Sequence, residues 1–92
     1  MTETEHKSLK EEINEIKTDL NNNSFIREFF ITSKKNILNI NSPAFLYYFE
    51  DHNNLQSKIQ ILENYGFVID ITTTNLKKYR MTEEFVNAVM AL

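Results

Sequence analysis

The chain has 92 residues, of which 41% are hydrophobic, and its formal net charge is −3. This length is enough for one small domain with its own core, and no apolar run is long enough to cross a membrane. The absence of cysteine excludes disulfides and thiol chemistry. Because no apolar stretch follows a basic start, no signal peptide is expected, and we predict a cytoplasmic protein without a membrane partner.

The first segment, residues 1–23, is predicted to be an amphipathic helix that ends in an asparagine-rich break. Its apolar residues recur at spacings of four, three and four and form a two-heptad seam: Leu9, Ile13, Ile16 and Leu20. One interpretation is a dimerisation helix that makes the protein a homodimer. The alternative is a helix that packs on its own domain, since two heptads are marginal for an isolated coiled coil.

Residues 24–92 contain all the aromatic residues of the chain and are predicted to form the main domain. Phe25, Ile26, Phe29 and Phe30 have the spacing of a broad buried helical face, which predicts a helix that runs to about Lys35. Residues 37, 38 and 40 are apolar, and they either close this helix or form a short strand.

A serine followed by a proline, Ser42-Pro43, is typical of a helix start, because serine caps well and proline loses no bond at the first helical position. We therefore predict a short helix over residues 44–51. Its aromatic residues either cover the core or form a surface for a partner.

The strongest local pattern lies in residues 55–85. Leu55, Ile59, Leu62 and Tyr65 predict a helix over 55–65, and Gly66 predicts its end, because glycine readily adopts the left-handed conformation. Alternating residues from 67 to 81 predict a two-stranded hairpin. Thr82 is a favoured N-cap, which predicts a closing helix behind it.

This succession resembles a winged helix-turn-helix domain, a DNA-binding superfamily. The matching residues are ILENYGFV at 61–68 and KKYRMTEEF at 77–85, and the likeness extends from Phe25 to the C-terminus. The resemblance implies an α+β fold, mostly α with a small β-hairpin, in which residues 44–51 and 55–65 are the helix-turn-helix pair. The N-terminal amphipathic helix would be an addition to that fold.

The resemblance also implies double-stranded DNA as the partner of a transcriptional regulator. The helix over 55–65 would enter the major groove with Asn54, Gln56, Ser57, Lys58 and Gln60. The hairpin would be the wing and would contact DNA through Thr74, Asn75, Lys77, Lys78 and Arg80. The net charge of −3 opposes this interpretation, since neutralised phosphates dominate affinity for DNA. The alternative function is a winged-helix protein–protein interaction module without DNA binding.

Catalytic residues are not indicated by the sequence. His6 and His52 lie in different segments, and no group of residues has metal-ligand spacing. The single glycine cannot form a glycine-rich phosphate loop. We therefore expect neither an enzyme nor a cofactor or metal site.

Overall fold

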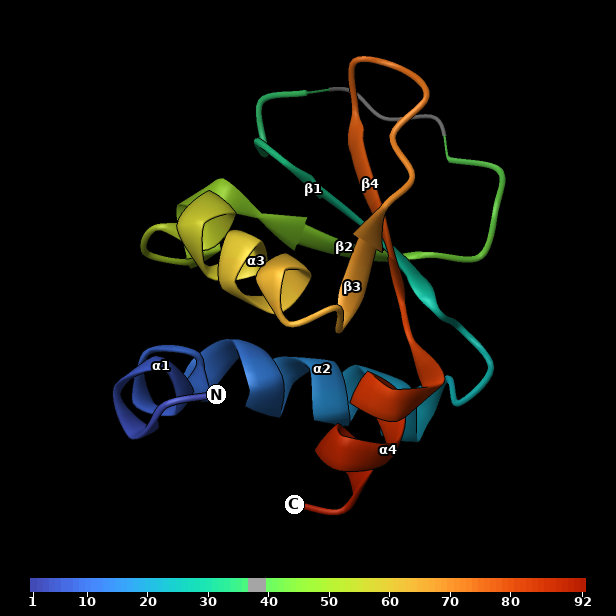
Figure 1. Cartoon of the computed structure of the whole chain (residues 1–92). Coiled ribbons are helices and arrows are strands. Elements are labelled where there is room, and N and C mark those ends of the chain that lie inside the picture. Colours follow the sequence, from blue (N-terminus) through green and yellow to red (C-terminus); the bar gives the residue numbers. More distant parts are fainter. Residues whose placement is uncertain (37–39) are drawn as a thin grey trace.

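The computed structural model describes residues 1–36 and 40–92 and has a mixed α+β architecture (Figure 1). In chain order its elements are α1 (Glu3–Ser8), α2 (Lys10–Asn22), β1 (Glu28–Thr32), β2 (Phe45–Tyr48), a 3-10 helix (Phe49–Asp51), α3 (Leu55–Asn64), β3 (Val68–Asp70), β4 (Lys77–Met81) and α4 (Glu83–Met90). The predicted α+β class is confirmed. The sheet contains the predicted hairpin together with two strands that were not predicted.

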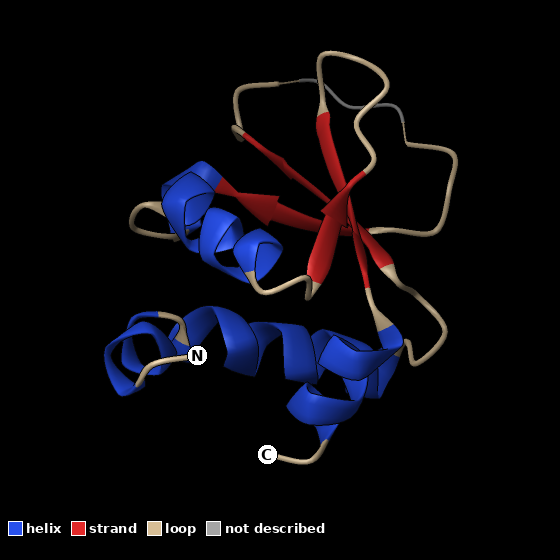
Figure 2. Cartoon of the chain, viewed as in Figure 1, coloured by secondary structure: helices blue, strands red, loops and turns tan. Residues whose placement is uncertain are grey.

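The sheet has the strand order β2-β1-β4-β3, in which β1 and β2 are parallel and the other two pairs are antiparallel. Helix α3 connects the two edge strands, β2 and β3. The helices gather on one side of the sheet, as Figure 2 shows. The opposite side carries no helix in the described part of the chain, and we call it the open face.

Strand alternation explains which side chains meet the helices. Cross-strand neighbours Phe29, Phe45 and Tyr79 are buried in the core, and Phe29 stacks on Tyr79 at 5.5 Å between ring centroids. The intervening residues of the four strands point to the open face: Glu28, Phe30, Thr32, Leu46, Tyr48, Ile69, Lys78 and Arg80.

The secondary structure predicted for residues 55–92 is confirmed. Helix α3 ends in a Schellman motif, in which Gly66 donates to the Glu63 carbonyl and Phe67 donates to the Leu62 carbonyl, both at 2.9 Å. Gly66 has a positive φ of 73°, which explains why glycine occupies this position. Strands β3 and β4 form the predicted hairpin, and the Thr82 side chain accepts a bond from the Phe85 N–H at the start of α4.

The helix predicted from residue 25 to Lys35 is wrong. Residues Glu28–Thr32 form strand β1, and Phe25 lies in the preceding connection with 96% of its surface exposed. A run of consecutive apolar residues fits a strand that is buried on both faces as well as it fits a helix. Here Phe29 and Phe30 are both buried, although they point to opposite faces.

The helix predicted over 44–51 is also wrong, because β2 and the 3-10 helix occupy these residues. Pairing with β1 satisfies the backbone of an aromatic segment that has high strand propensity. A strand therefore stands where the resemblance requires the first helix of a helix-turn-helix pair. The expectation for Ile37 and Leu38 lies outside the described residues, whereas Ile40 belongs to neither a helix nor a strand.

The predicted N-terminal helix is present as α2, preceded by the short helix α1. The four seam residues are at most 5% exposed and belong to the same core as the strands and α3: Leu9, Ile13, Ile16 and Leu20. The seam is thus covered by the chain itself, as in the second of the two interpretations, and it is not free to pair with a second chain. Residues from both predicted segments, 1–23 and 24–92, share this core. No helix among the described residues is long and apolar enough to span a membrane.

Candidate functional site: the open face of the sheet

Helix α3 presents polar side chains to solvent, as predicted for a DNA-reading helix. Its exposed residues, with the preceding cap, are Asn54, Gln56, Ser57, Gln60 and Asn64. Lys58 differs, because its ammonium lies 3.1 Å from the Glu12 carboxylate and the side chain is 16% exposed. The one cation of this helix is therefore directed toward α2.

The hairpin cations are paired with acidic residues of the same chain. Lys77 lies 3.6 Å from Asp70. Lys78 and Arg80 both bind Glu28, at 3.0 and 3.4 Å. The bond from Lys78 holds the pKa of the Glu28 carboxyl below its ordinary value, so this acidic group stays ionised beside the two cations.

The ten predicted DNA-contacting residues do not form one surface. Lys78 and Arg80 point to the open face, whereas Lys77 lies on the helix side together with Tyr79. Helix α3 also lies on the helix side, away from Lys78 and Arg80. Thr74 and Asn75 are exposed in the loop between β3 and β4, and the Thr74 hydroxyl accepts the Leu76 N–H at 3.2 Å.

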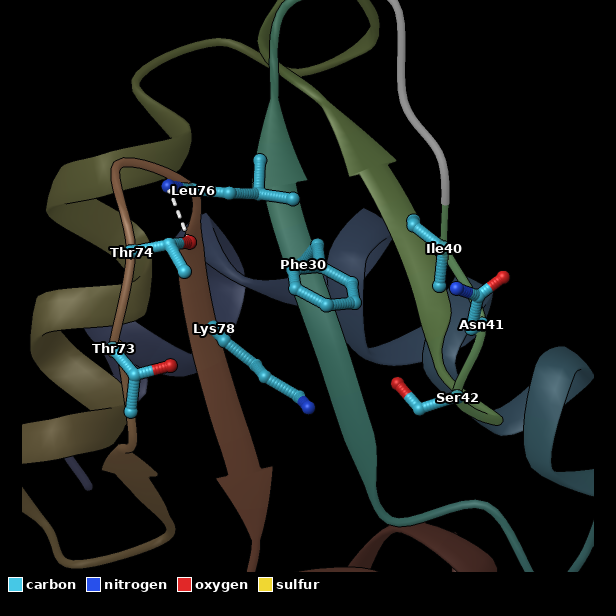
Figure 3. A pocket seen from close by; sticks show the side chains of 8 residues that line it. All are labelled: Phe30, Ile40, Asn41, Ser42, Thr73, Thr74, Leu76 and Lys78. Atoms are coloured by element: carbon cyan, nitrogen blue, oxygen red, sulfur yellow. Dashed lines mark hydrogen bonds between the residues drawn. The ribbon is translucent and has the colours of Figure 1, made fainter.

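A hollow of about 410 Å³ lies on the open face. The ring of Phe30 is at its centre, with the Lys78 ammonium 5.2 Å from the ring centroid (Figure 3). One side is formed by the segment that leads into β2, and the other by the β3–β4 loop and Lys78. The remaining lining residues are Ile40, Asn41, Ser42, Thr73, Thr74 and Leu76.

A second hollow of about 550 Å³ adjoins the first, because Ile40 lines both. Leu46 and Tyr48 of β2 contribute apolar surface to it, and Lys34 and Asn36 contribute polar groups. The Lys34 ammonium lies 5.6 Å from the Tyr48 ring centroid and 2.7 Å from the Asp51 carboxylate. Together the two hollows form one continuous surface of mixed character. Its apolar residues are Phe30, Ile40, Leu46, Tyr48 and Leu76, and its cations are Lys34 and Lys78.

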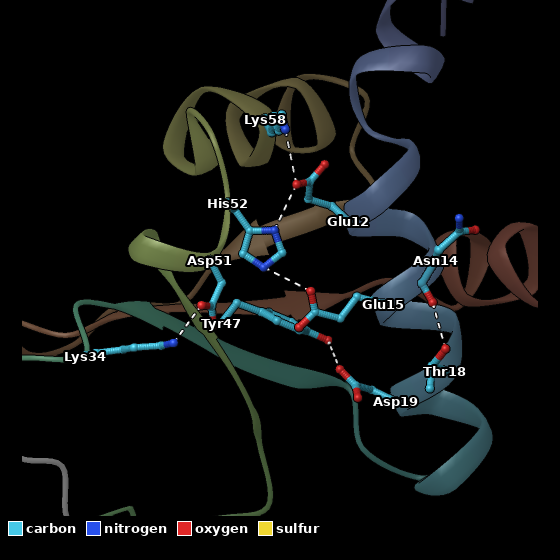
Figure 4. A network of polar contacts seen from close by, with 10 residues as sticks. All are labelled: Glu12, Asn14, Glu15, Thr18, Asp19, Lys34, Tyr47, Asp51, His52 and Lys58. Atoms are coloured by element: carbon cyan, nitrogen blue, oxygen red, sulfur yellow. Dashed lines mark hydrogen bonds and ion pairs between the residues drawn. The ribbon is translucent and has the colours of Figure 1, made fainter.

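A buried polar cluster, which sequence analysis missed, joins α2 to β2 and α3 (Figure 4). His52 lies between two carboxylates, with Nδ1 2.9 Å from Glu12 and Nε2 3.0 Å from Glu15. Burial raises the pKa of Glu12, but the bonds from His52 and Lys58 outweigh burial and hold this pKa below its ordinary value. Burial is the main reason that the pKa of Glu15 is raised.

The buried cluster has no room for a substrate, since the cavity beside it measures about 10 Å³. Its bonds tie α2 to His52 and to Lys58 of α3. A signal for it existed in the sequence, because Glu12 lies three residues after Leu9 and four before Ile16, on the apolar face of α2. Within the described residues, no group of three or more His, Cys, Asp or Glu side chains could hold a metal ion.

Comparisons with models of known protein families, with curated proteins and with solved structures found no match to this chain. Function is therefore inferred from the residues of this chain alone.

Proposed function

We propose that this chain is a non-catalytic protein-interaction module whose partner docks on the open face of the sheet. The observation that carries this proposal is the apolar character of a sheet face that no described helix covers. A solvent-facing sheet side is normally polar, but here Leu46 and Tyr48 are half-buried and Ile69 is 49% exposed. Hollows that expose apolar side chains beside polar and charged groups are typical of docking sites.

The charges of this face favour a protein over a nucleic acid. Lys78 and Arg80 share the single carboxylate of Glu28, and Lys34 is paired with Asp51. Affinity for DNA comes from several phosphates that Lys or Arg side chains neutralise, whereas most of the positive charge here is already paired, in a chain of net charge −3. Lys78 and Arg80 exceed the charge of Glu28 by one, which suits a partner segment that combines apolar side chains with a single acidic group.

Selection of peptides from a random display library on the intact protein tests the proposal. We expect peptides that combine apolar and acidic residues. Their affinity should fall by about tenfold or more, equivalent to about 1.4 kcal/mol, in Tyr48→Asp or Leu76→Asp. Gln60→Asp, on the exposed side of α3, is the matched control and should bind as the wild type does. Peptides that bind all three variants equally would contradict docking on the open face.

DNA binding is the second candidate, and the uncovered polar side of α3 together with the exposed loop residues Thr74 and Asn75 favours it. In the winged-helix arrangement that the sequence resembles, α3 would enter the major groove and the β3–β4 hairpin would be the wing. The hairpin cations would then exchange Glu28 and Asp70 for phosphates.

Fluorescence anisotropy of a random duplex at about 50 and 200 mM salt tests this candidate, because affinity based on phosphate contacts falls by orders of magnitude over this range. Salt-sensitive binding that is lost when Lys77, Lys78 and Arg80 are all replaced by alanine would favour DNA over a protein partner. Our first proposal predicts no salt-sensitive binding.

A further inference from the structure

The two edges of the sheet differ in how well they are protected. Edge strands expose unpaired backbone groups, and proteins usually block them with charged residues, proline, bulges or very short strands. Strand β3 has three residues, one of which is Asp70. Strand β2 has four residues, all apolar or aromatic, with the sequence FLYY.

The outer edge of β2 has unused hydrogen-bonding capacity. Its one strand neighbour in the sheet is β1. Among the described residues, no hydrogen bond outside the β1 ladder reaches the backbone of Phe45–Tyr48. As far as the described residues are concerned, the backbone of this edge is therefore available to a further strand.

We infer that β2 pairs antiparallel with β2 of a second copy of this chain and joins two sheets into one. Residues directly opposite in an antiparallel pair point to the same face. A twofold axis at Leu46 meets this requirement, because it places Leu46 opposite Leu46 of the second copy and Phe45 opposite its Tyr47. An axis at Tyr47 would place Phe45 opposite Phe49, which already belongs to the 3-10 helix.

The chemistry of this register is self-complementary. Each pair within the strand is apolar, on the helix side through Phe45 and Tyr47 and on the open face through Leu46. Strand β2 itself carries no charged side chain, so this register brings no like charges together within the paired strands.

The contact is short, so the dimer belongs to the weak class of interfaces, with a dissociation constant of roughly 100 µM. It does not depend on what binds the open face, and it replaces the N-terminal seam as the means of self-association. If the peptide selection fails, the dimer proposal still stands. If the protein proves to be monomeric, the docking proposal still stands.

Cysteine crosslinking tests the inference directly, because the natural chain contains no cysteine. In Leu46→Cys the two thiols would face each other across the axis, with Cβ atoms about 4.5–5.5 Å apart. We expect mild oxidation to give a covalent dimer well before it does so in Ile69→Cys, the control on the other edge strand. Ile69 is the more exposed of the two residues, so random collision would favour the control. Equal or slower crosslinking of Leu46→Cys would overturn the proposal.

Sedimentation equilibrium supplies an independent test with charged variants. Leu46→Arg places two like charges opposite each other at the axis, and it should abolish the dimer while circular dichroism stays unchanged. Ile69→Arg adds the same charge to the same face at the other edge and should dimerise like the wild type. A wild-type protein that remains monomeric up to about tenfold above the expected dissociation constant would overturn the proposal.

Discussion

The substitution Leu20→Ala tests whether the N-terminal seam belongs to the core of a single chain. The Leu20 side chain is 1% exposed and is part of the main hydrophobic cluster. The substitution removes three carbon atoms from the core. At about 0.8 kcal/mol each, their loss should lower the free energy of unfolding by about 2.4 kcal/mol. A cavity that does not collapse raises the cost to between about 2.5 and 5 kcal/mol. A domain of this size should then melt at least about 10 °C lower.

Urea and thermal unfolding followed by circular dichroism measure this loss. Asn14→Ala, an exposed change on the same helix, is the control and should alter stability by less than about 0.5 kcal/mol. Both measurements should be made at a low micromolar protein concentration, because the proposed weak dimer would not form there. There the wild-type midpoint should stay constant over about a tenfold change in concentration. A midpoint that rises with concentration, or a Leu20→Ala cost below about 1 kcal/mol, would refute burial of the seam within one chain.

Two further substitutions test the polar cluster and the end of α3. Glu12→Gln should lower the free energy of unfolding by roughly 2 to 3 kcal/mol near neutral pH, because Lys58 and His52 lose a carboxylate partner. The pKa of Glu12 is lowered in the fold, so its contribution is present above the ordinary carboxyl pKa and is lost as the pH falls through the lowered value. Urea titrations from about neutral to acid pH should therefore give a flatter profile for this variant, and parallel profiles would contradict the cluster geometry. Gly66→Ala should cost roughly 1 kcal/mol in the same assay, because φ is +73° while nothing lies within 4 Å of an added Cβ. No measurable loss would argue against the left-handed conformation.

The part of the fold that could be predicted is the part that local signals determine. Three local signals determine the secondary structure of residues 55–92. They are the glycine after the apolar pattern of α3, the alternation of the hairpin and the threonine that caps α4, and each acts on residues close to it in the sequence. Strands β1 and β2 depend on each other and on β4, which lies 45 or more residues after β1 in the sequence. The run Phe29-Phe30-Ile31 fits a helix or a doubly buried strand, and pairing with β4 decides between them.

The same limit explains the candidate site. The basic residues of the hairpin were identified from the sequence, but the pairing of Lys78 and Arg80 with Glu28 was not, because Glu28 meets Arg80 through the register of β1 and β4. The open face could not be predicted either, because it depends on β2, and the sequence had indicated a helix at these residues. Glu12 is the exception, since a carboxylate on the apolar face of α2 could have indicated a buried partner.

The most direct test of the proposed docking surface is a map of backbone amide shifts in labelled protein as a selected peptide is added. Docking on the open face predicts that the largest changes lie in β1, β2 and β4 around Phe30, Leu46 and Lys78. The exposed side of α3 around Gln56 and Gln60 should stay unchanged. The largest changes on α3, with the open face undisturbed, would contradict the proposal and would place recognition on the helix that the resemblance to winged helix-turn-helix domains indicated.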